Sequence, residues 1–111
     1  MDEELNNLNT RIDFERLKLD RINKIQDEIN TMNQSLNNCI DIAYTSKIAP
    51  STKSNYEHLK DEINESHKRT NEDLNLVKDI TKVNINNLLD TQDDMMTKER
   101  ENQDNEEKED N

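Results

Sequence analysis

The chain has 111 residues, of which 29% are hydrophobic and 37% are charged, and its formal net charge is -11. A globular domain usually has nearly half apolar residues, so this chain is too polar to enclose a compact core without partners. Its acidic charge disfavours direct binding to nucleic acid and to anionic membrane surfaces.

Glycine is absent from the sequence, which bears on both fold and chemistry. Tight β-hairpin turns need the positive φ angles that glycine adopts, so a β fold is disfavoured. Phosphate-cradling loops also need glycine, so neither a P-loop nor a dinucleotide-binding motif is present. The remaining fold class is all-α.

The first long helix is predicted over residues 1–46. Acidic residues at its start suit the helix dipole, and nothing before Ser46 strongly breaks a helix. One heptad register is kept by Leu5, Leu8, Ile12, Leu19 and Ile22. If this register continued, the next core position would be Gln26. Because Ile25 is apolar, we assign the position to Ile25, which implies a skipped residue in the heptad.

From this point an apolar stripe follows the helix, with residues spaced alternately three and four apart. The stripe consists of Ile22, Ile25, Ile29, Met32, Leu36, Cys39 and Ala43. A stripe with this spacing packs against other helices. Cys39 is therefore expected to be a buried structural residue.

A turn is predicted at residues 47–53, because Pro50 disfavours helical geometry in the residue before it. A link this short joins antiparallel neighbours. The second helix is predicted over residues 54–96. Ser54 and Glu57 fit a capping box at its start, and Ser51 and Thr52 are alternative caps. The remaining residues, 97–111, are acidic and have no side chain able to pack, so we expect a disordered tail.

The second helix has apolar residues on two sides, which predicts contact with two neighbours. One side holds Leu74, Val77, Ile85, Leu88 and Leu89, and the other holds Leu76, Ile80 and Val83. The middle of this helix is polar, and His67 is expected to be partly buried there. We therefore predict a helical hairpin that completes a coiled coil or four-helix bundle with partner chains.

No catalytic, cofactor-binding or metal-binding residues are assigned. The carboxylates are expected on solvated helix faces, and no nucleophile is paired with a base. No apolar run approaches the roughly 20 residues that span a bilayer, and the N-terminal residues lack the features of a secretory signal. We expect an intracellular protein that is not an enzyme, does not insert into membranes and takes no small-molecule substrate.

Two sets of residues carry a family resemblance. In the first helix they are Glu15-Arg16-Leu17-Lys18, Ile22-Asn23-Lys24-Ile25, Ile29, Met32, Gln34 and Ile42, and after the break they are Tyr56-Glu57, Ile63 and Leu74. With these residues the chain resembles subunit 11 of the Mediator complex. It covers residues 15–89, but the spacing between Lys18 and Ile22 is longer than in that family. The resemblance implies a nuclear subunit of the Mediator head module that pairs with subunit 22 in a four-helix bundle and serves as a transcription coactivator.

The predicted function is assembly with other helical subunits in a hetero-oligomer. Its interface is predicted to comprise Ile22, Ile25, Ile29, Met32, Leu36, Leu74, Val77, Ile80, Val83 and Leu88. Two other complexes fit the same composition: an organelle-positioning or lysosome-biogenesis complex, and a DASH-type kinetochore complex. The nucleus is the favoured location and the cytoplasm is the alternative.

Overall fold

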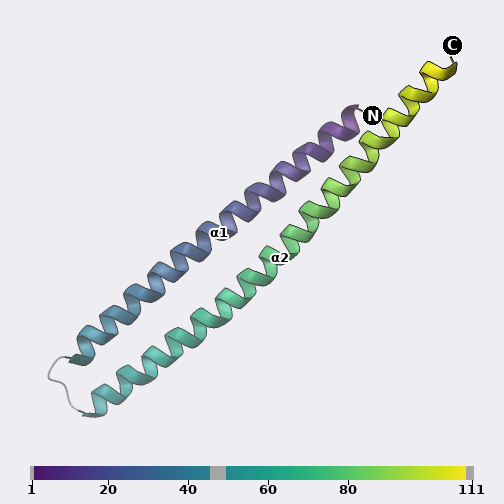
Figure 1. The fold of residues 1–111 in the computed structure, drawn as a ribbon. Coiled ribbons are helices and arrows are strands. Elements are labelled where there is room, and N and C mark those ends of the chain that lie inside the picture. The colour runs from purple at the N-terminus through teal and green to yellow at the C-terminus, as the bar shows by residue number, and fades with distance from the viewer. Residues whose placement is uncertain (1, 46–49, 110–111) are drawn as a thin grey trace. The chain divides into compact units, whose positions relative to one another are not determined.

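The computed structural model describes residues 2–45 and 50–109, and all of them are helical. Helix α1 spans Asp2–Thr45 and helix α2 spans Pro50–Glu109. The two helices run antiparallel as a hairpin (Figure 1). The prediction of an all-α fold with two long antiparallel helices is confirmed. No helix among the described residues has an apolar stretch long enough to cross a membrane.

Helix α2 begins earlier and ends later than predicted. It begins at Pro50, inside the predicted turn, because proline is tolerated in the first turn, where its missing N–H would have no partner in the helix. Residues 47–49 of the predicted turn lie outside the described residues. The acidic segment expected to be disordered is helical as far as Glu109. This segment lacks glycine and proline and is rich in Glu, and its Lys, Arg and Gln residues also favour helix.

Contacts group the hairpin into two units. In the first unit the start of α1, up to Asp20, pairs with the part of α2 from Asp79 onward. The most buried hydrophobic side chains here are Leu8, Ile12 and Ile85, at 3–9% exposure. The seam between the two segments follows the predicted register and also contains Thr81, which is only 2% exposed. A hydrogen bond from Gln92 to Asn9 joins the two segments.

The second unit comprises Arg21–Lys78 and pairs the rest of α1 with the first half of α2. Ile22 and Ile40 are its buried hydrophobic residues, each 7% exposed. Between them the seam is formed partly by polar residues that are half-buried, including Gln26, Asn33 and Asn37. Its apolar core is therefore narrow.

The prediction that Ile25 replaces Gln26 at the core position after Ile22 is wrong for the seam between α1 and α2. Gln26 is half-buried, whereas Ile25 is 43% exposed, so the register of Leu19 and Ile22 continues into Gln26. The physical reason is that the amide of Gln26 finds hydrogen-bond partners on α2. The same register leaves Cys39 exposed, so Cys39 is not part of the core that α1 and α2 form with each other.

We expect Ile22→Ala to destabilise the purified chain by about 2–4 kcal/mol, as is usual for truncation of a buried isoleucine. The matched variant Ile25→Ala removes the same atoms from an exposed position and should cost less than about 1 kcal/mol. Urea unfolding followed by circular dichroism measures both. If the two variants lose equal free energy of unfolding, Ile25 lies in the core and the predicted skip in the heptad is correct.

Candidate partner-helix interface

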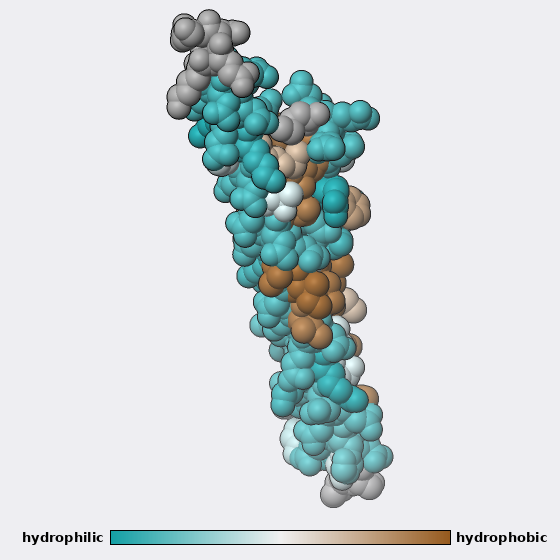
Figure 2. All heavy atoms as spheres, turned by 90° about the vertical axis from the view of Figure 1, so that its right-hand side faces the viewer, coloured by the Kyte–Doolittle hydropathy of each residue, from teal (hydrophilic) through white to brown (hydrophobic). Residues whose placement is uncertain are grey.

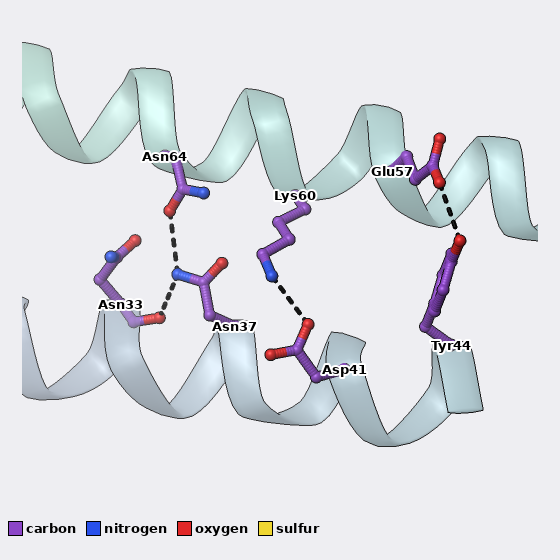
Figure 3. A network of polar contacts seen from close by, with 7 residues as sticks. All are labelled: Asn33, Asn37, Asp41, Tyr44, Glu57, Lys60 and Asn64. Carbon is purple, nitrogen blue, oxygen red and sulfur yellow. Dashed lines mark hydrogen bonds and ion pairs between the residues drawn. The ribbon is translucent and has the colours of Figure 1, made fainter. Parts of the chain in front are cut away.

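One edge of the second unit is closed by polar contacts between α1 and α2, shown in Figure 3. The pairs are Asn37 with Asn64 at 2.9 Å, Asp41 with Lys60 at 2.7 Å and Tyr44 with Glu57 at 3.0 Å. We call these six residues the polar edge. Their positions on α1 are spaced three and four residues apart, which places them on one side of that helix.

Gln26 extends this set of contacts along α1. Its Nε2 donates to Asn75 Oδ1 at 2.7 Å and to Asn71 Oδ1 at 3.4 Å. Lys78 Nζ lies 3.5 Å from Gln26 Oε1 and donates to it. Gln26 lies about three helical turns before Asn37, so both are on the same side of α1. Polar side chains at a helix–helix seam fix the register, because a shift would leave them without partners.

An apolar groove of about 480 Å³ lies between α1 and α2 in the same unit. Its apolar lining consists of Ile29, Met32 and Leu36 from α1 and Leu59 and Ile63 from α2. Met32 is 63% exposed, and Leu36 and Leu59 are exposed by nearly half. An exposed apolar groove of this kind marks a site of protein contact. Hydrophobic side chains also gather as a patch among hydrophilic ones on the face of the molecule drawn in Figure 2.

The polar lining of the groove comprises Asn33, Glu62, Ser66, His67 and Thr70. Two of its polar atoms, Asn33 Oδ1 and His67 Nδ1, are buried and have no hydrogen-bond partner. Leaving a buried polar atom unpaired costs on the order of 1–3 kcal/mol. His67 is half-buried, as predicted.

The predicted interface residues divide into two groups in the structure. Ile22, Ile29, Leu74 and Leu88 are buried or half-buried. Ile25, Met32, Leu36, Val77, Ile80 and Val83 are exposed. The groove brings Ile29, Met32 and Leu36 together, while Ile80 and Val83 belong to the other unit. Their shared role in binding a partner stays a prediction.

Sequence reasoning left Leu59 and Ile63 out of the interface, although both line the groove. A signal was present, because the two residues are one turn apart and project from the same side of α2. The polar residues that follow, Ser66, His67 and Thr70, break the apolar pattern and hide it. The structure shows that these polar residues line the same groove.

A second groove, of about 520 Å³, lies within the first unit. It is lined by Thr10, Arg11, Phe14, Glu15, Asn84, Asn87 and Leu88. Phe14 is 61% exposed, and the ammonium of Lys18 lies 5.4 Å from the centre of its ring. Two apolar residues, Phe14 and Leu88, line this groove, against five in the groove of residues 21–78, so it is a weaker candidate for helix docking.

No family model, curated protein or solved structure matches this chain.

The polar edge predicts a pH effect at Tyr44. Its hydroxyl donates a hydrogen bond to Glu57, and this bond, together with the nearby negative charge and slight desolvation, raises the pKa of Tyr44 above its ordinary value of 10.0. The contact is fully present below pH 10 and is lost as the pH rises through the raised pKa.

Absorbance titration of tyrosinate in a Tyr56→Phe background reports Tyr44 alone, because the chain has two tyrosines. We expect a midpoint above 10.0 that falls toward 10.0 in Glu57→Gln. An unchanged midpoint in Glu57→Gln would show that the contact is not formed in solution.

Proposed function

We propose that this chain is a non-catalytic helical subunit of a multiprotein complex and that the apolar groove of residues 21–78 receives a helix of a partner protein. The observation that carries this proposal is the difference between the two edges of that unit. One edge is closed by hydrogen bonds and an ion pair between the helices, whereas the other exposes Met32, Leu36 and Leu59. A third helix laid along the open edge would bury these side chains.

The narrow core supports the same proposal. Among the described residues, the buried hydrophobic side chains are Leu8, Ile12, Ile22, Ile40 and Ile85. Among these described residues, more large hydrophobic side chains are exposed than buried. Burial of apolar surface contributes roughly 25 cal/mol per Å², so a partner that covers the exposed residues would add stability that the hairpin alone does not have.

The groove offers no arrangement suited to catalysis. Ser66 and His67 both line it, but adjacent residues of a helix point about 100° apart and do not face each other. The carboxylate in the lining belongs to Glu62, which lies on α2 like Ser66 and His67. These features favour binding over group transfer.

The resemblance of residues 15–89 to Mediator subunit 11 supports a more specific proposal. In that proposal the chain is a nuclear subunit of the Mediator head module, and the helix in the groove comes from its partner subunit in a four-helix bundle. The groove residues lie within the resembling span, which is consistent with this placement.

Native purification of the tagged chain, followed by mass spectrometry, tests the proposal. Met32→Asp places a charge in the groove and should abolish recovery of the partner subunits. The control Ile42→Asp alters a side chain that is 70% exposed and does not line the groove, so partner recovery should be unchanged.

Recovery of Mediator head subunits with the unaltered chain is the expected result. Recovery of trafficking or spindle proteins instead would reject the Mediator placement while keeping the helical interface. Undiminished partner recovery by Met32→Asp would reject the groove as the binding site.

A further inference from the structure

The charged side chains that line the apolar groove and the hollow beside it are carboxylates. A shallower hollow shares Met32 with the groove and is lined by Asp27, Glu28, Thr31 and Met32. Together the two hollows are lined by the carboxylates of Asp27, Glu28 and Glu62, and neither contains a lysine or an arginine. Glu62 on α2 and Glu28 on α1, which precedes Met32 by about one helical turn, therefore place negative charge on both sides of a helix docked in the groove.

These carboxylates are not neutralised by ion pairs with other described residues. In the part of the chain that the structure describes, the ion pairs are Lys18 with Glu15 and Lys60 with Asp41. Neither pair includes a carboxylate that lines the two hollows. Basic side chains on a docked helix would meet these groups with complementary charge, which favours encounter and fixes register.

We propose, building on the proposed function, that the occupant of the groove is an amphipathic helix of another protein, with apolar residues at heptad spacing and Lys or Arg on both flanks. The groove from Ile29 to Leu36 is about two helical turns long, which suits three apolar side chains of the partner.

A second copy of the chain is the less favoured occupant. Each copy has a net charge of -11 and would bring the same carboxylates to the interface. Like charges placed against one another oppose association. Charge complementarity therefore favours a basic partner over self-association.

Two synthetic peptides provide the probes. Each is about three heptads long with leucine at the core positions, and the flanking positions are lysine in one and glutamate in the other. Fluorescence anisotropy with the full chain in about 0.15 M salt measures binding. We expect the lysine-flanked peptide to bind about tenfold more tightly than its glutamate-flanked twin, because exposed ion pairs each contribute a modest amount.

Paired variants locate the charge effect. Glu28→Gln combined with Glu62→Gln should weaken binding of the lysine-flanked peptide by about tenfold. Glu65→Gln combined with Glu72→Gln removes the same charge from exposed positions on the side of α2 away from the groove, and should change the affinity much less. If both double variants lose the same affinity for the lysine-flanked peptide, the peptide is attracted by the overall charge of the chain, and the proposal is overturned.

A second pair of variants locates the groove itself. Leu59→Glu should abolish binding of the lysine-flanked peptide although it adds negative charge. Leu76→Glu, at an exposed position on the same helix outside the groove lining, should leave the binding intact. Circular dichroism of each variant confirms that the helices are retained.

The outcomes separate the two proposals. If both peptides bind equally well and Leu59→Glu abolishes both, the groove receives a helix, but the basic partner is rejected. If neither peptide binds, or Leu59→Glu has no effect, the groove proposal fails as well. If sedimentation equilibrium shows a dimer that Leu59→Glu dissociates, the occupant is a second copy, and the basic partner is again rejected.

Discussion

The polar contacts between α1 and α2 determine how residues 21–78 present their apolar side chains. Asn37, Asp41 and Tyr44 bind partners on α2 along one edge, which fixes the rotation of α1 about its own axis. With that rotation fixed, Met32 and Leu36 turn toward the opposite edge and line the groove. Together with the buried side chains of Ile22 and Ile40, these hydrogen bonds leave the apolar groove on the edge opposite to them. The candidate function depends on this arrangement.

The fold could be predicted because its cause is local. Heptad spacing, the absence of glycine and a single proline are sufficient to indicate two long helices joined by a short link. The register at Gln26 could not be predicted in the same way. Its hydrogen-bond partner Asn71 is 45 residues away in the sequence, so a local comparison of side chains favours the more apolar Ile25. The helical acidic segment was missed because low hydrophobicity was weighed above helix propensity.

The candidate site was predicted only in part. The spacing of Ile29, Met32 and Leu36 shows that they share one side of a helix, but not whether that side meets α2 or remains open. That choice depends on the polar edge, which involves residues of both helices. The contribution of Leu59 and Ile63 also requires the pairing of α1 with α2 to be known. Patterns within one helix indicate which residues can bind, while the register between helices decides which ones remain exposed.

The most direct test of a covered groove uses Cys39, the only cysteine in the chain. Cys39 is exposed and lies two helical turns after Met32, on the same side of α1. Its alkylation rate should be measured by maleimide labelling of the purified chain and of the native assembly in cell extract, with denatured extract as the reference for full reactivity. Our account predicts strong protection in the assembly. Equal rates while the partners remain bound would contradict it.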